Sequence, residues 1–212
     1  MQSFIRTDQY HYIQEQARTL VNSRSSTNDQ DVTSAIKAMT QEKVIDLFHN
    51  LTEDQKQMIA QIDQVKDEAD ALFFLSRLKQ YILPFPSITE NEIKQLFPKA
   101  KKINVPNLED VSWNQLSYLG WNDPGSLKKY IVTRRNGDLI GLQGSFTPSS
   151  QPGICTICHE TEDVGMFAIT KKGKGPEQTI TRGNYICQDS DQCNRNLTDA
   201  YSLHQFIDRL QA

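Results

Sequence analysis

Cysteine is scarce in this chain: its 212 residues include four cysteines, and all four lie in the last third. Long apolar runs are missing too. No segment approaches the roughly 18–20 apolar residues that a membrane helix needs, and the first residues hold no apolar stretch of signal-peptide length. We therefore expect a cytoplasmic protein that makes no membrane contact. Thiols stay reduced in the cytoplasm, so closely spaced cysteines there favour a metal site over disulfides.

Motifs of the common enzyme classes are also missing from the sequence. It has no HExxH helix, no paired acid and base, and no glycine-rich loop that could cradle a phosphate. We find no internal repeat and no low-complexity segment. These absences predict that the protein is not an enzyme.

Charge is spread unevenly along an otherwise ordinary globular composition, with 37% hydrophobic and 23% charged residues. The net charge is −3. Residues 1–93 carry nine Lys and Arg against fourteen Asp and Glu, whereas residues 94–135 carry eight against three and residues 151–212 carry six against eight. The basic middle is typical of a solvated face, or of a surface that contacts RNA or an acidic protein.

Apolar residues recur at helical spacing through the first 83 residues, which predicts a domain, 1–83, built as a four-helix bundle. Thr52 and Gln55 have the spacing of a capping box, and the prolines at 84 and 86 end the fourth helix. The residues expected to be buried are Tyr10, Ile13, Ala17, Leu20, Val21, Val32, Ile36, Met39, Leu47, Phe48, Met58, Ile59, Ile62, Val65, Leu72, Leu75, Leu78 and Ile82.

The pattern changes after the prolines, and residues 84–212 are expected to form a second, α/β domain, so that the fold class is α+β. Thr89 and Glu92 form another capping box before a short helix, and the segment 101–106 predicts a strand. Alternating apolar runs flank Asn136-Gly137, a pair that tolerates the positive φ of a type I′ turn, so 128–146 predicts a hairpin. The segment 147–153 is predicted to be a loop or short linker.

The cysteines follow the pattern Cys155-x2-Cys158, then 28 residues, then Cys187-x5-Cys193. The first pair is a short knuckle, and Asp189, Ser190 or Asp191 can cap a final helix whose first turn contains Cys193. Between the pairs, "VGMFAI" and "TITRGNYI" can be the strands of a hairpin with "TKKGKGPEQ" as its turn. Residues from about 153 to 212 are therefore predicted to form a four-cysteine treble-clef zinc finger.

Four thiolates saturate a tetrahedral zinc ion, whereas a catalytic zinc ion keeps one position open for water or substrate. We therefore expect one structural zinc ion held by Cys155, Cys158, Cys187 and Cys193, and no catalytic residues. The alternatives are a catalytic zinc site and redox-active cysteines. His159 is a further candidate ligand, although its position next to Cys158 makes simultaneous ligation awkward.

If the metal only braces the fold, function lies on the surface. Leu203, Ile207 and Leu210, with Ala200, form an apolar stripe in the final helix, and Phe206 lies roughly 80° from its centre. Phe206 is therefore expected to be partly exposed and, with Tyr185 and Arg182, to belong to an interface, because interfaces use aromatic residues and arginine as anchors. The alternative is that Phe206 and Tyr185 complete the core. Residues three apart in a regular strand point to opposite faces, so Arg182 and Tyr185 share a face only if Gly183 forms a bulge.

The chain contains, in this order, the segments "YILPFPS", "KKINVP", "GWN", "CTIC", "GNYICQDSDQCN", "LTD" and "FIDRL". By this ordered set the whole chain resembles the FusB family of fusidic acid resistance proteins. The resemblance implies a helical bundle followed by a domain that ends in a four-cysteine zinc finger. It also implies a non-enzymatic protein that binds the C-terminal domains of elongation factor G as a monomer in a 1:1 complex, acts on the ribosome indirectly, and releases the factor from drug-stalled ribosomes.

The resemblance further implies four partner-binding positions, which correspond here to Ile154, Arg182, Tyr185 and Phe206. Ile154 departs from the aromatic residue of the family and loses ring stacking. Arg182 replaces a lysine, which keeps the charge but changes the donor geometry. The rival hypothesis is a zinc-finger protein that binds ribosomal RNA through its basic middle region.

Overall fold

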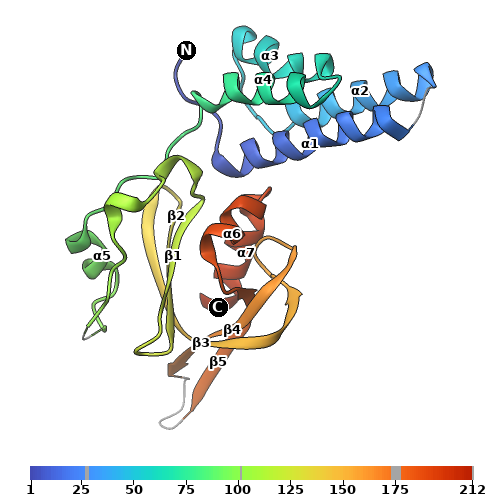
Figure 1. Ribbon diagram of the computed structural model, residues 1–212. Coiled ribbons are helices and arrows are strands. Elements are labelled where there is room, and N and C mark those ends of the chain that lie inside the picture. Colours follow the sequence, from blue (N-terminus) through green and yellow to red (C-terminus); the bar gives the residue numbers. More distant parts are fainter. Residues whose placement is uncertain (27–28, 101, 173–177, 212) are drawn as a thin grey trace. The chain divides into compact units, whose positions relative to one another are not determined.

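The computed structural model describes residues 1–26, 29–100, 102–172 and 178–211 (Figure 1). The chain divides into two compact units, Met1–Leu83 and Pro84–Ala212. Within the described residues, we find no helix that is both long and apolar enough to cross a membrane.

The first unit consists of helices, as predicted. They are α1 (Thr7–Ser26), α2 (Gln30–Ile45), α3 (Glu53–Ala60), the short 3₁₀ turn η1 (Gln61–Gln64) and α4 (Glu68–Lys79). Thr52 caps α3 with the predicted capping box, in which the Gln55 side chain accepts a hydrogen bond from the Thr52 amide. The core comprises Ile5, Ile13, Ala17, Leu20, Val44, Ile59, Ile62, Val65, Phe74 and Leu78.

Three residues that were expected to be buried in this bundle are exposed. Leu72 is 72% exposed, and Met39 and Val32 are exposed as well. In α4 the buried residues are Phe74 and Leu78, which lie four residues apart on one side of the helix. Leu72 is about 200° around the helix from Phe74, so burial of Phe74 turns Leu72 to solvent.

The second unit is an antiparallel sheet with helices, which confirms the α+β class. Its five strands follow the order β1-β2-β3-β4-β5. They are β1 (Tyr118–Asp123), β2 (Lys128–Arg135), β3 (Asp138–Ile154), β4 (Thr161–Lys172) and β5 (Thr179–Cys187). The helical segments are α5 (Glu90–Leu96), η2 (Leu108–Asp110), η3 (Trp113–Gln115), α6 (Ser190–Asn196) and α7 (Ala200–Gln211).

The two predicted hairpins are confirmed. Asn136 and Gly137 both have positive φ, 52° and 94°, and join β2 to β3. Strands β4 and β5 pair in continuous register from Val164↔Cys187 to Lys172↔Thr179. Most of the turn predicted between them, residues 173–177, lies outside the described residues, as do residues 27–28 in the polar segment after α1.

Two predictions about the middle of the chain are wrong. The described part of the segment 101–106 is not a strand, and its Asn104 side chain donates a hydrogen bond to Asp123 instead of joining a ladder. The segment 147–153 is not a linker, because β3 runs through it to Ile154 and pairs with β4 on both sides of an irregularity between Pro148 and Pro152. The finger therefore shares one continuous sheet with the β2–β3 hairpin.

Helices cover both faces of the sheet at β1 and β2. In Figure 1, α5 lies on one side of β1 and β2, and α6 and α7 lie on the other. Tyr130 and Val132 belong to the core on the α5 side, whereas Ile131, between them in β2, belongs to the core that contains the cysteines. The period of two along β2 thus divides its side chains between two cores.

The predicted final helix is two helices. Cys193 lies in α6, and the apolar stripe lies in α7. Leu197 ends α6, and the Asp199 carboxylate accepts a hydrogen bond from the Tyr201 amide at the start of α7. Asp189, one of the three predicted capping residues, caps α6. Its side chain accepts hydrogen bonds from the backbone amides of Asp191 and Gln192.

Candidate metal centre and binding surface

The four cysteines converge on one point although three parts of the chain supply them: the knuckle between β3 and β4, the end of β5, and α6. All four are buried, and their sulfur atoms lie within 4.8 Å of one another. The Sγ atoms of Cys155 and Cys193 are 3.8 Å apart, and those of Cys158 and Cys187 are 3.7 Å apart. A tetrahedron with zinc–sulfur bonds of about 2.3 Å has sulfur–sulfur edges of about 3.8 Å, so the four sulfurs fit a zinc ion.

The surrounding backbone prepares the sulfurs for negative charge. The amides of Ile157 and Cys187 both point at Cys155 Sγ, at 3.3 and 3.4 Å. Hydrogen bonds from Cys158 and the other two cysteines lower the pKa of the Cys155 thiol, whereas hydrogen bonding to Cys155 raises the pKa of Cys193. Four sulfurs that share protons in this way become four thiolates when a divalent cation replaces the protons.

His159 is turned away from this cluster. Its Nε2 lies 2.9 Å from Ser202 Oγ in α7, and its backbone has the left-handed φ of 63°. The knuckle is closed by a hydrogen bond from the His159 amide to the Cys155 carbonyl. Four cysteine ligands leave a zinc ion with no open position, and the site therefore holds one structural zinc ion.

A fully buried lysine, which the sequence suggested was part of the basic surface, faces the metal site. The Lys129 side chain is 0% exposed and donates hydrogen bonds to Asn122 Oδ1 and to the Gln188 carbonyl, next to Cys187. Burial lowers the pKa of Lys129 to about 8, and the sulfurs of Cys193 and Cys187 act in the opposite direction. A zinc ion with four thiolates has a net charge of about −2, which Lys129 offsets from within the core.

Residues of the "GWN" segment hold α6 against β1. A Cβ atom on Gly120 would lie 2.5 Å from Ser190 Oγ, so only glycine allows this approach. The side-chain amide of Asn122 donates a hydrogen bond to the backbone carbonyl of Gln188. Asn194 fixes the other end of α6, because its side chain accepts from the Ser117 and Tyr118 amides and donates to the carbonyls of Tyr118 and Ser190.

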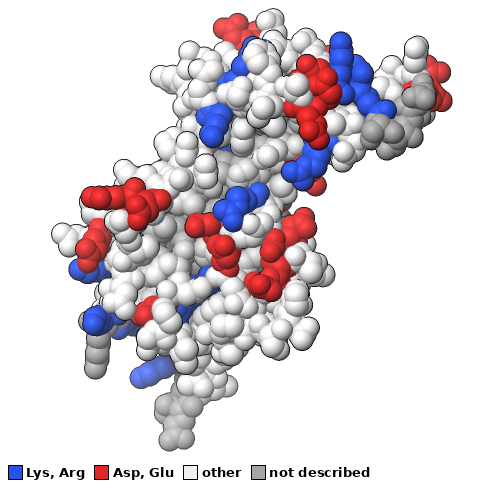
Figure 2. All heavy atoms as spheres, in the orientation of Figure 1, with Lys and Arg blue, Asp and Glu red and all other residues white. Residues whose placement is uncertain are grey.

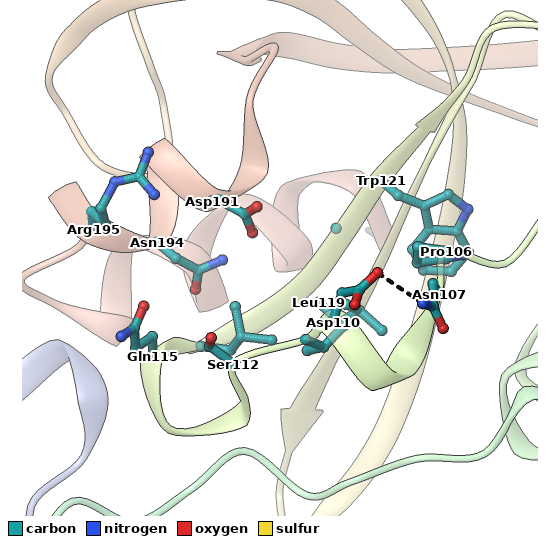
Figure 3. Close-up of a pocket in the computed structure, with 13 residues that line it drawn as sticks. Pro106, Asn107, Asp110, Ser112, Gln115, Leu119, Trp121, Asp191, Asn194 and Arg195 are labelled. Carbon is teal, nitrogen blue, oxygen red and sulfur yellow. Dashed lines mark hydrogen bonds between the residues drawn. The ribbon is translucent and has the colours of Figure 1, made fainter.

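A hollow of about 520 Å³ lies between α6 and the segment before β1, and Figure 3 shows the residues that line it. Asp191, Asn194 and Arg195 project from α6, and Asp110 faces them from η2. Most of these groups serve the fold: Asn194 uses both ends of its amide, Arg195 donates to Gln192, and Asp110 accepts from Asn107. Among the described residues that line it, we find no pairing of a nucleophile with a base.

Two of the four predicted partner-binding residues are exposed near the knuckle. Ile154 is 68% exposed and Tyr185 is 44% exposed. The Thr156 amide, two residues after Ile154, donates to the Tyr185 carbonyl at 2.9 Å, so the knuckle runs beside Tyr185. Both side chains therefore stand on backbone that the zinc ligands Cys155 and Cys187 hold in place.

Arg182 does not share the face of Tyr185. The β4–β5 register is continuous through Gly183, and Arg182 lies opposite Ile169 whereas Tyr185 lies opposite Met166. The bulge that would have brought the two side chains together is not present in this described stretch. Arg182 is instead on the side of Phe167, which points toward α7.

The expectation that Phe206 is partly exposed is wrong. Phe206 is 1% exposed and packs against the ring of Phe167, with 5.9 Å between ring centroids. The buried arc of α7 is set by Leu203, Phe206, Ile207 and Leu210, while Ala200 is only half-buried. The centre of this arc lies about 30° closer to Phe206 than the centre of the predicted stripe, so Phe206 is about 50° from it and its ring enters the core.

Comparisons with known proteins agree with this arrangement. Residues 4–86 match the family model described as elongation factor G-binding protein, N-terminal, and residues 95–208 match the FBP C-terminal treble-clef zinc-finger model. The solved structure of the fusidic acid resistance protein FusC is similar, with a TM-score of 0.86, 29% identity and coverage of 97% of each chain. A search of curated proteins gives no match.

These matches confirm the resemblance that the sequence motifs indicated. The zinc-finger model alone spans more than half of the chain, and its span contains all four cysteines. The N-terminal model spans the helical unit. The chain therefore belongs to the family of elongation factor G-binding proteins that end in a treble-clef zinc finger.

Proposed function

We propose that this protein binds the C-terminal domains of elongation factor G and promotes release of the factor from ribosomes stalled by fusidic acid. It acts in the cytoplasm as a monomer in a 1:1 complex and contacts the ribosome only through the factor. The observation that carries the proposal is the pair of family matches along one chain, supported by the similarity to FusC over 97% of both chains.

The proposal assigns no catalytic step to this protein. Its metal ligands form a closed set of four cysteines, and such a set supports a fold but activates no water. A binding protein can speed release only if it favours a conformation of the factor that the ribosome holds poorly, because a ligand shifts an equilibrium through its differential affinity for the two states.

The direct test is release of elongation factor G from ribosomes in the presence of fusidic acid, followed by rapid filtration or fluorescence. We expect the purified protein to increase the release rate in proportion to its concentration until the factor is saturated, as a 1:1 binding protein does. An unchanged release rate at saturating protein would contradict the proposal. Binding of the factor without faster release would limit the function to binding.

The proposed docking surface is Ile154 and Tyr185, the exposed residues on either side of the knuckle. Tyr185→Ala should weaken binding to elongation factor G about tenfold or more, because a partly exposed tyrosine on a rigid support is a typical interface anchor. Ile154→Ala should weaken binding in the same direction. Isothermal titration calorimetry with the purified factor measures both effects.

The matched control for this experiment is Ile180→Ala, because Ile180 lies on the same strand and is 41% exposed. It is about 16 Å along the strand from Tyr185 and should leave the affinity unchanged. Wild-type affinity in both the Tyr185→Ala and Ile154→Ala variants would exclude this surface. Phe206→Ala is not a clean test, since it empties the core between α7 and β4.

The rival hypothesis, RNA binding through the basic middle region, loses several of its charges in the structure. Lys129 is buried, Lys94 pairs with Glu90, and Arg135 pairs with Asp208. On the face shown in Figure 2, acidic side chains gather over α6 and its surroundings, which opposes a polyanion there. We therefore favour a protein partner.

A further inference from the structure

A second hollow of the C-terminal unit lies between β5 and the end of α7. Its volume is about 520 Å³. Two arginines line it, Arg182 from β5 and Arg209 from α7, together with Phe206 and Leu210. The described residues that line it include no acidic side chain.

The floor of this hollow is apolar and rigid. Phe206 and Leu210 are 1% and 3% exposed and belong to the core that also contains the cysteines. Arg182 reaches the hollow because it is on the α7 side of β5, the side away from Tyr185. One arrangement thus explains both the buried position of Phe206 and the separation of Arg182 from Tyr185. Phe206 and Leu210 form the floor of the hollow, and the two arginines, Arg182 and Arg209, form its cationic rim.

Among the residues that the structure describes, the two arginines at this rim have no carboxylate partner. Lys94 and Arg135, by contrast, are paired with Glu90 and Asp208. Neither Arg182 nor Arg209 forms an ion pair with a carboxylate of the described residues. Two positive charges beside an apolar floor attract an anion more strongly than they would in open water, because the floor lowers the local dielectric constant.

We propose that this hollow receives an acidic side chain of elongation factor G. Its carboxylate binds between the guanidinium groups of Arg182 and Arg209, and its methylene groups contact the Phe206 and Leu210 floor. The inference rests on the proposed function and adds the chemistry of one contact. Arginine suits this role because its planar fork donates two parallel hydrogen bonds to a carboxylate.

A carboxylate is favoured over a nucleic-acid phosphate by the charge of the surroundings. Residues 151–212 carry six Lys and Arg against eight Asp and Glu, so the finger as a whole repels a long polyanion. A single acidic side chain on a folded partner meets only the local positive charge of the rim. The hollow therefore gives the factor a contact that is separate from the Tyr185 surface, on the other side of β5.

The test is calorimetric titration of the full-length zinc-loaded protein with purified elongation factor G. Arg209→Glu should weaken binding about tenfold or more, because it places a carboxylate where the partner's carboxylate binds. Arg209→Lys should bind with intermediate affinity, since it keeps the charge and loses the fork. The control is Arg195→Glu, the same change at an exposed arginine of α6 that does not line this hollow.

The outcomes separate this inference from the proposed function. If the wild-type protein does not bind the factor, the proposed function fails. If the wild type binds and Arg209→Glu binds equally well, only the acidic contact fails. Equal losses of affinity in Arg209→Glu and Arg195→Glu would show general electrostatic attraction and would also overturn the acidic contact. The same conclusion would follow if Arg209→Glu lost binding to naked ribosomal RNA while its affinity for the factor stayed unchanged. Zinc content and melting temperature, measured for each variant, confirm that the fold is intact.

Discussion

Removal of the zinc ion, by a strong chelator or by Cys193→Ser, should unfold the finger and abolish binding to elongation factor G. Zinc binding to a small module contributes on the order of 10 kcal/mol, which is comparable with the whole stability of a domain. The cysteines belong to the same core as Phe206, Ile207 and Leu210, so loss of the ion removes the centre around which this core packs. Without it, the backbone that carries Ile154 and Tyr185 is no longer fixed.

Circular dichroism and differential scanning calorimetry measure this effect. The metal-free protein should lose the transition of the C-terminal unit but keep much of its helical signal, because the cysteine-free unit Met1–Leu83 has a hydrophobic core of its own. The control is Asn196→Ser on the same helix as Cys193. The Asn196 side chain donates a hydrogen bond to Glu162 of β4 and does not touch the metal site, so this variant should retain zinc. A chelated protein that melts as before and binds the factor undiminished would refute the structural role of the ion.

The features that could be predicted from the sequence depend on short-range rules. The capping box of Thr52 and Gln55 joins residues three apart, and the Asn136-Gly137 turn depends on the φ angles of two adjacent residues. The cysteine spacing was also sufficient to identify the metal ligands. The CxxC knuckle places two thiolates locally, and the end of β5 and the capped helix after it place the other two. These signals are independent of the rest of the chain.

The errors concern side chains whose surroundings come from distant parts of the chain. The segment 147–153 has the composition of a loop, yet pairing of Pro152 with Asp163 draws it into β3. From the sequence alone, Lys129 is expected to be a charged surface residue. It is buried instead, and its side chain donates a hydrogen bond to the carbonyl of Gln188, 59 residues away. The burial of Phe206 depends on contacts with distant residues, among them the ring of Phe167 in β4. No local pattern contains these contacts.

Asn194 is another residue whose role only the structure reveals, although it lies in the "DQCN" segment next to a zinc ligand. Its side chain is 1% exposed and makes four hydrogen bonds to backbone groups, two of them from the amides of Ser117 and Tyr118. These residues are 77 and 76 positions away, so one amide group ties α6 to the start of β1. The same helix carries Cys193, and this tie therefore positions a metal ligand.

Asn194→Ala should lower the free energy of unfolding of the C-terminal unit by about 3–5 kcal/mol, because it leaves the buried Tyr118 amide and the partly buried Ser117 amide without this acceptor. Asn196→Ala is the matched control on the same helix. Its partners Glu162 and Gln192 are side chains in a partly exposed setting, and its effect should stay below about 1 kcal/mol. Chemical denaturation of the zinc-loaded protein measures both values.

Equal effects of the two substitutions would mean that the Asn194 bonds add nothing beyond helix packing. A large effect of Asn194→Ala alone, accompanied by faster zinc loss to a chelator, would show that the α6–β1 tie supports the metal site.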